Sequence, residues 1–325
     1  MFGSIPGYEG TVSGEGAAPQ PKWSVSQISE AEARAALCDY VSSKCCYSNE
    51  PARESVITDM ESFHTYRYRL ETFTESRSTA WAEEPFTGQR VDAFTQPAPA
   101  PWDVHVKAPP MFQDSKTTVE VPHTSSVKPC PPCVGMGRHP CKDCSSTGRK
   151  MCWSCSGSGF PQGSQCLQCN GSGRISCTQC GGSGSKDCKK CGGKGQLLIC
   201  IKLTVKWTNN LEDYVQEQSS GLQVEKLKKV SGKQLFRDAQ FLVYPVMGFP
   251  DPAMAQAAER LIRDHQSRLS KTGRILQQRQ TIELVPITKV SYKWKEGFYT
   301  YFVYGTENAV KAEDYPATCC CCTVI

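Results

Sequence analysis

The 325-residue sequence lacks the segments that direct a chain into or across a membrane. Its first sixteen residues hold no Lys or Arg and no apolar run of about 7–15 residues, so we expect no secretory signal. No stretch of about 18 apolar residues occurs, which excludes a membrane-spanning helix. Phe2, not glycine, follows the initiator Met, which excludes N-myristoylation. We therefore expect a reducing compartment, the cytosol or the nucleus, where paired cysteines indicate metal or redox sites.

The sequence also lacks a recognisable catalytic arrangement. It contains neither a phosphate-binding loop nor an HExxH motif. No acid and nucleophile are spaced around a histidine in the manner of a triad. The five histidines are scattered at His64, His105, His123, His139 and His265. We expect no enzymatic activity.

Cysteine, by contrast, is abundant, with 20 residues in the chain. Twelve of them form six CxxC pairs between residues 130 and 191. Two thiolates at this spacing can bind one tetrahedral ion at about 2.3 Å each, so six pairs supply three four-cysteine sites. We predict three structural zinc ions. Their predicted ligands are Cys130, Cys133, Cys141, Cys144, Cys152, Cys155, Cys166, Cys169, Cys177, Cys180, Cys188 and Cys191.

Glycines follow each pair in the pattern CxxCxGxG, except that Ser146 replaces the first glycine of the second repeat. Here the chain must turn sharply and direct its N–H groups at the thiolates, which requires positive φ angles that glycine adopts without strain. A redox role would instead need a helix start after each pair, which the glycines disfavour. No ligand position is left for water, so we do not expect catalytic zinc.

The spacing between successive pairs is 11, 11, 14, 11 and 11 residues, the same in both directions. A hairpin bent at its midpoint would nest the pairs, joining 130/133 with 188/191, 141/144 with 177/180, and 152/155 with 166/169. The segment FPQGSQ at 160–165 has the proline and glycine of a bend. Sequential pairing explains the spacing of 11 but not the central 14. In the nested arrangement Trp153 and Phe160 lie at the tip. We expect these two apolar side chains to be exposed there and to contact a partner.

The charge of the cysteine region changes when metal is counted. The chain has a formal charge of +5, and residues 130–195 alone hold nine basic and two acidic residues. Each zinc with four thiolates carries a charge of −2, so three sites leave this region near +1 and the whole chain near −1. Phosphate binding needs surplus cations, so this balance weakens a nucleic-acid interpretation.

The flanks predict an α+β fold: a mixed or antiparallel sheet domain with flanking helices and an inserted zinc-stapled, β-hairpin-like arm of six CxxC repeats. Ser29 and Glu32 form a capping box for a helix over 30–45, and Pro252 begins another over 251–269. Alternating segments predict strands over 64–77, 116–122, 196–207, 280–294 and 297–305. Two unrelated domains in tandem are the alternative.

We divide the chain into five segments on this basis. Residues 1–22 are rich in Gly, Ser and Pro and are expected to be disordered. Two α+β segments, 23–128 and 197–315, surround the cysteine-rich arm at 129–196. Residues 316–325 form a cysteine-rich tail.

The six repeats resemble the DnaJ-type cysteine-rich domain, whose signature is CxxCxGxG. That resemblance implies zinc, nested pairing and an arm projecting from a β-rich, substrate-binding domain, although the DnaJ-type domain has four repeats and two zincs. The His-Pro-Asp tripeptide of a J domain is absent, the nearest match being His139-Pro140-Cys141. The whole chain, including PITKVSYKW and YFVYG, is similar to the SSU-two homologue family. This similarity implies a zinc-dependent protein-interaction or chaperone-like role.

The chain ends in CCCCTVI, and its last four residues fit the CaaX prenylation pattern. Stable membrane anchoring needs a second signal, which acylation of the neighbouring thiols would supply. The candidate lipidation sites are Cys319, Cys320, Cys321 and Cys322. A thiol-rich tail without lipid is the alternative.

We therefore expect a non-enzymatic zinc-binding protein-interaction module that binds unfolded polypeptides or chaperones through the arm and the adjoining sheet. It would be cytoplasmic or nuclear, with a peripheral membrane fraction if the tail is lipidated. A zinc-scaffolded nucleic-acid binder is one alternative, suggested by the lysines of the CKKC segment. A thiol-disulfide oxidoreductase is the other.

Overall fold

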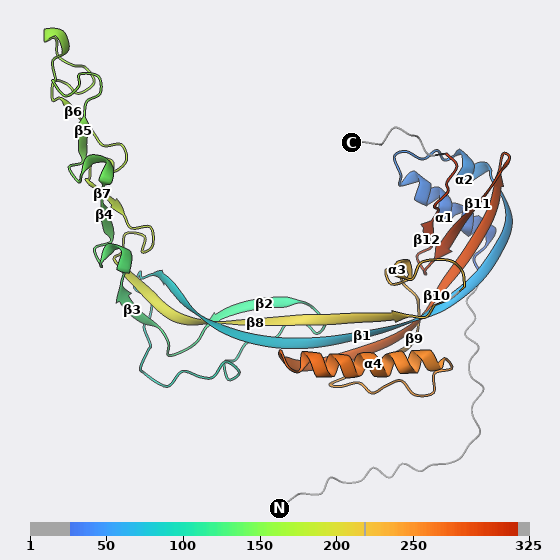
Figure 1. Cartoon of the computed structure of the whole chain (residues 1–325). Helices are drawn as coiled ribbons and strands as arrows, with labels where there is room; N and C mark the ends of the chain where they lie inside the picture. Colours follow the sequence, from blue (N-terminus) through green and yellow to red (C-terminus); the bar gives the residue numbers. More distant parts are fainter. Residues whose placement is uncertain (1–26, 218, 318–325) are drawn as a thin grey trace, which may run out of the picture.

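The computed structural model describes residues 27–217 and 219–317 (Figure 1). A long, curved antiparallel sheet forms its body, in the order β12-β11-β10-β1-β8-β2, with β3 paired to β8 and β9 to β10. The predicted mixture of helices with an antiparallel sheet is confirmed. The strands are β1 (Val56–Pro85), β2 (Ser115–Glu120), β3 (Ser126–Pro129), β8 (Gln196–Val215), β9 (Lys233–Gln240), β10 (Arg274–Trp294), β11 (Gly297–Tyr304) and β12 (Ala309–Lys311).

Strand β1 joins the two halves of the sheet. Its residues from Val56 to Glu75 pair with β10, and those from Arg67 to Pro85 pair with β8. The segment 67–75 therefore has hydrogen-bonded neighbours on both sides. Figure 1 shows β1 running the length of the body, with β8 beside it at one end and β10 at the other.

The helices pack on this sheet in two places. Helix α1 (Glu30–Ser42) begins with the predicted capping box of Ser29 and Glu32 but ends three residues before the predicted limit. It lies with α2 (Glu50–Glu54) at the β11 end of the sheet, whereas α4 (Pro252–Leu269) lies along the middle (Figure 1). A fourth helix is the short α3 (Val224–Leu227). In the part of the chain described, no helix combines the length and apolar character needed to span a membrane.

Alternation along β1 separates an apolar face from a charged one. Tyr68 and Leu70 pack against Leu261 and Ile262 of α4. The opposite face has ion pairs across neighbouring strands, such as Arg69 with Asp213, Arg67 with Glu283, and Glu71 with Arg279. The charged face is also covered here, since Arg67 is 2% exposed and donates to the carbonyls of Leu227 and Val230.

The cysteine region leaves the sheet between β3 and β8, whose adjoining ends pair Pro129 with Gln196. Strands from both flanks thus belong to one sheet and do not form two tandem domains. Beyond this point β4 (Arg138–Pro140) pairs with β7 (Ser185–Asp187), and β5 (Arg149–Met151) pairs with β6 (Arg174–Ser176). Figure 1 shows this segment extending away from the body. We call residues 129–196 the arm.

A buried histidine lies between α4 and the sheet. His265 is 1% exposed; its Nδ1 lies 2.8 Å from Thr72 Oγ1 and its Nε2 lies 3.1 Å from Glu212 Oε2. Thr72 is also fully buried and accepts a hydrogen bond from Gln278, so this array has no exposed nucleophile. It serves to position α4. Burial lowers the pKa of His265, against the opposing effect of Glu212.

This depressed pKa makes stability depend on pH. The unfolded chain binds the His265 proton more tightly than the folded chain does, so the folded state loses stability as pH falls below about 6.5. We expect the urea midpoint of the wild type to fall over that range more steeply than the midpoint of His265→Gln. Equal slopes would contradict this assignment. Loss of metal in acid affects both proteins and cancels in the comparison.

Candidate metal centres

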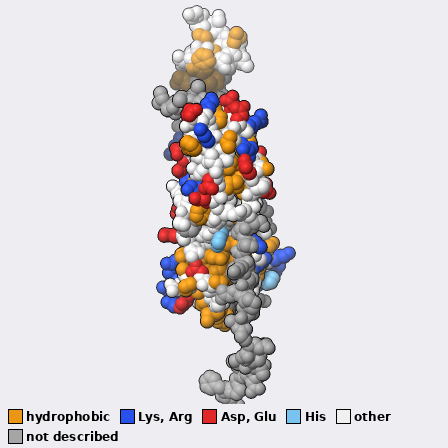
Figure 2. All heavy atoms as spheres, turned by 90° about the vertical axis from the view of Figure 1, so that its right-hand side faces the viewer, with side chains coloured by type: hydrophobic (Ala, Val, Ile, Leu, Met, Phe, Trp, Pro, Cys, Tyr) orange, Lys and Arg blue, Asp and Glu red, His pale blue; other side chains and the backbone are white. Residues whose placement is uncertain are grey.

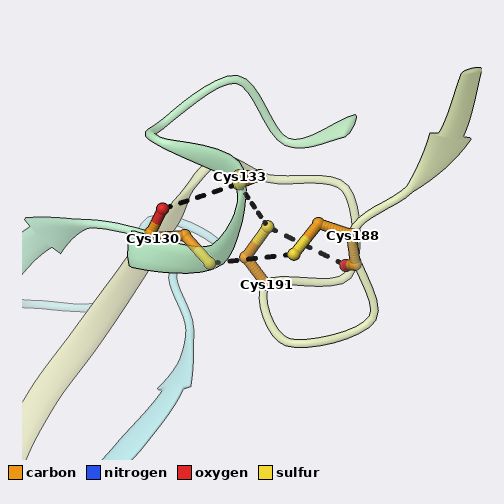
Figure 3. A group of neighbouring side chains, drawn as sticks. All are labelled: Cys130, Cys133, Cys188 and Cys191. Carbon is orange, nitrogen blue, oxygen red and sulfur yellow. Dashed lines mark hydrogen bonds between the residues drawn. The ribbon is translucent and has the colours of Figure 1, made fainter. Parts of the chain in front are cut away.

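Three groups of four cysteines lie along the arm. Within each group all four Sγ atoms lie within 4.8 Å of one another. The structure groups the pairs as in the nested arrangement and not in the sequential one. Figure 3 shows the group nearest the sheet, where the four thiols converge from two facing loops. The groups are Cys130, Cys133, Cys188 and Cys191; Cys141, Cys144, Cys177 and Cys180; and Cys152, Cys155, Cys166 and Cys169.

The sulfur spacing fits a tetrahedral ion. A Zn–S bond of about 2.3 Å gives a tetrahedron edge of about 3.8 Å. Six Sγ–Sγ distances across the arm, two in each group, lie between 3.7 and 3.9 Å, and the others do not exceed 4.8 Å. The arm residues described thus form three groups of four thiols, each able to hold one metal ion.

Each CxxC segment forms the same tight turn. In the first repeat Cys130 is extended, residues Pro131–Cys133 form a 3₁₀ turn, and Val134 is left-handed with a φ of 52°. The equivalent residues of the other repeats also have positive φ, between 47° and 58°. This left-handed residue reverses the chain, so that the following glycines approach the sulfur atoms. The equivalent residues are Ser145, Ser156, Asn170, Gly181 and Gly192.

The second glycine of every repeat donates its N–H to the sulfur of the second cysteine, at 3.2–3.3 Å. Such a bond favours the thiolate, the form that binds metal. Burial opposes ionisation of Cys155, yet the N–H of Gly159 and neighbouring thiols lower its pKa to about 7. The pKa values of Cys180 and Cys191 fall to about 7 in the same way. At these three cysteines, one in each group, the contacts favour the thiolate.

The second glycine has a further role that the sequence analysis missed. A Cβ at any of these six positions would lie 2.1–2.3 Å from a backbone carbonyl oxygen of the facing repeat. The two backbones approach too closely for a side chain at this point. The sequence held a signal that the second glycine is the more constrained of the two. All six second glycines are present, whereas Ser146 replaces one first glycine.

The middle site offers a matched test. A Cβ on Gly148 would lie 2.1 Å from the Gly182 carbonyl oxygen. The nearest atom to a Cβ on Gly182 would be the Ser176 hydroxyl oxygen, at 3.8 Å. We expect Gly148→Ala to speed metal release from the purified protein to a chromogenic chelator about tenfold or more. Gly182→Ser copies the natural Ser146 of the facing repeat, adds only the strain of a side chain at positive φ, and should release metal much more slowly than Gly148→Ala. Equal release by both variants would contradict the close-approach argument.

The tip of the arm exposes apolar side chains and has no charged ones. Trp153 is 74% and Phe160 56% exposed, and Leu167 and Met151, which sequence reasoning missed, are 90% and 69% exposed. Trp153 and Leu167 hold equivalent positions, each directly after the first cysteine of its repeat. Residues 152–173 include no Asp, Glu, Lys, Arg or His. Figure 2 shows the hydrophobic and uncharged far end of the arm above a body covered with both signs of charge.

The inner part of the arm is charged, and many of its charges are paired. Lys186 lies 2.9 Å from Asp143, and Arg138 lies 3.0 Å from Asp187. Lys190 reaches Glu83 of β1 at 2.6 Å, which ties the arm to the sheet. These pairs consume cations that a nucleic-acid surface would need to leave available for phosphates.

The remaining predicted sites lie outside the metal centres. The candidate lipidation sites Cys319, Cys320, Cys321 and Cys322 lie outside the described residues, as does the segment 1–22. Cys200 is buried on β8, and the turn after α1 exposes Cys45.

Comparison with known proteins places the chain in a family. It is 58% identical to the Protein SSUH2 homolog of Danio rerio, over 99% of this chain and 94% of that protein. The chain belongs to the SSUH2 homologue family. The family member of Homo sapiens is 48% identical over 93% of this chain and 81% of its own length. The member of Mus musculus is 46% identical over 77% of this chain and 75% of its own length.

The predicted membership of the SSU-two family is thereby confirmed. No family model matches the chain, and no solved structure matches it. The DnaJ-type character of the arm therefore remains a prediction from its repeats. The names of these SSUH2 relatives state no activity, ligand or partner.

Proposed function

We propose that the arm is a zinc-stapled hairpin that presents an apolar tip to other polypeptides, and that the protein acts as a non-enzymatic, chaperone-like binding module. Four sulfur ligands in a tetrahedron are typical of zinc or iron–sulfur sites. Four protein ligands leave no position for water or substrate, which favours a structural zinc. Each zinc would link the outgoing half of the arm to the returning half.

The exposed tip is the observation that carries the binding proposal. Soluble proteins seldom expose several large apolar side chains together unless a partner covers them. Here Trp153, Phe160 and Leu167 belong to the two repeats that form the outermost cysteine group and the bend between them. This part of the arm lies farthest from the sheet (Figure 1). A charge-free surface of this kind suits apolar stretches of an unfolded polypeptide, because no ionic group is desolvated on contact.

The adjoining sheet extends the proposed surface. Trp81 is 67% exposed on β1, where that strand pairs with β8 near the root of the arm. A bound polypeptide would contact both the tip and this part of the sheet. The clients would be cytosolic or nuclear proteins. If the tail is lipidated, they would include proteins at a membrane surface.

Protection of a model client from aggregation tests the proposal. We expect the full-length zinc-loaded protein to suppress light scattering by a thermally unfolding client at near-stoichiometric ratio. The double variant Trp153→Ser/Leu167→Ser should lose most of this protection, because it removes the two most exposed apolar groups of the tip.

A matched variant controls for the loss of apolar surface in general. Val134 and Met136 are 78% and 70% exposed but lie in the innermost repeat. Val134→Ser/Met136→Ser should protect the client as the wild type does. If the wild type gives no protection, or if both variants lose it equally, the tip is not the binding surface.

A further inference from the structure

A groove lies between helix α1 and strand β12, at the end of the sheet opposite the arm (Figure 1). Its volume is about 370 Å³. Ala35 and Ala36 of α1 line it together with Val310 of β12, and these short side chains leave its middle open. The remaining lining residues are Glu32, Asp39 and Tyr40 on α1, and Glu307, Asn308 and Ala309 at the start of β12.

Strand β12 has a free outer edge along this groove. It is the last strand of the described sheet on this side, and it pairs only with β11, where Val310 lies opposite Val303. No hydrogen bond joins residues 309–311 to any other described backbone segment. Val310 packs against the same apolar cluster as Ala36, so its side chain is on the α1 face of the sheet. An edge of this kind can pair with an extended polypeptide.

The groove is negatively charged. Three carboxylates and no Lys, Arg or His line it, the three being Glu32, Asp39 and Glu307. Hydrogen bonds from Ser29 lower the pKa of Glu32, which keeps this carboxylate charged at neutral pH. The Asp39 carboxylate forms no ion pair or hydrogen bond with the described residues. Lys311 of β12 pairs with Glu313 at 2.7 Å and does not line the groove. A cationic ligand would therefore complement this surface.

We propose that the α1–β12 groove binds an extended polypeptide with basic residues at alternate positions, which adds to β12 as a further strand. Successive side chains of a strand point to opposite faces, so every second residue of the ligand faces α1. Lys or Arg at these positions pairs with Asp39 and the neighbouring carboxylates, and its methylene stem lies against Ala35. Hydrogen bonds to the β12 backbone supply affinity, and the carboxylates select the sequence.

The terminal segments of the chain do not match this groove in charge. Residues 1–26 contain one lysine and two glutamates, and residues 318–325 contain no charged side chain. Nucleic acids and anionic lipids would be repelled by the carboxylates. The ligand is therefore a basic segment of another polypeptide. This proposal does not depend on the arm tip, which is uncharged and lies at the other end of the molecule (Figure 1).

Fluorescence anisotropy with short labelled peptides and the full-length, metal-loaded protein tests the proposal. The probe is Lys-Val-Lys-Val-Lys-Val with blocked ends. We expect it to bind about tenfold more tightly than Lys-Lys-Lys-Val-Val-Val, which has the same composition but cannot direct all its cations to one face. Glu-Val-Glu-Val-Glu-Val should not bind. Hydrogen exchange at the amides of residues 309–311 should slow when the probe is bound.

Matched variants locate the binding site. Ala35→Leu fills the groove and should weaken probe binding about tenfold or more, whereas Ala31→Leu, at an exposed position of α1 outside the groove, should bind as the wild type does. Asp39→Asn should weaken binding about two- to fivefold, the range for one exposed ion pair. Asp264→Asn, an exposed acid-to-amide change on α4, should have no effect. An unchanged melting temperature shows that each variant is folded.

Four results would overturn the proposal. Equal binding of the two basic peptides would indicate general charge attraction, and equal binding by the wild type and Ala35→Leu would place the probe elsewhere. Unchanged exchange at 309–311 would contradict strand addition. Binding that appears only after removal of residues 1–26 would mean that the chain's own N-terminal segment occupies the groove. Trp153→Ser/Leu167→Ser should bind the probe normally, which separates this site from the proposed function of the tip.

Discussion

The convergence of four thiols at each of three points is the constraint on which the arm depends. The buried clusters described in this segment consist of cysteines, joined by Leu197 at the root and a partly buried Ile175 farther out. The ladders β4–β7 and β5–β6 contribute only three residue pairs each. An isolated two-stranded ladder of this length has little stability in water. Metal coordination would therefore take the place of a hydrophobic core, and metal binding and folding of the arm would be one process.

The sheet supports this arm at a defined place. Strands β3 and β8 continue directly into its two sides, and Glu83 of β1 binds both Lys128 of β3 and Lys190 of the arm. Charges are paired near this root, whereas residues 152–173 at the far end are uncharged. The arm is thus polarised along its length, with an ionic attachment to the body at one end and an apolar surface at the other.

Much of this arrangement could be predicted from the sequence, because its signals are local. The capping box of Ser29 and Glu32 and the Pro252 start of α4 both depend on residues within a few positions. The repeat spacing identified the twelve thiols, and its symmetry favoured the grouping that the structure has. The midpoint bend at 160–165 contains a short 3₁₀ turn, Pro161–Gly163.

The features that were missed depend on distant partners. Strand β1 was predicted over 64–77 but extends from Val56 to Pro85, because β10 and β8 supply pairing at its two ends. The short strand β9 was not predicted, since it is defined by its pairing with β10. The exposure of Leu167 and the contact of Tyr315 with Tyr47 also depend on segments brought together by the fold.

The most direct test of the account is the metal of the purified full-length chain, measured by elemental analysis together with zinc-edge X-ray absorption. The account predicts three zinc ions per chain, each with four sulfur ligands at about 2.3 Å. Two or fewer zinc ions, or nitrogen and oxygen in the coordination shell, would contradict it. Iron in place of zinc would equally refute the proposed structural role.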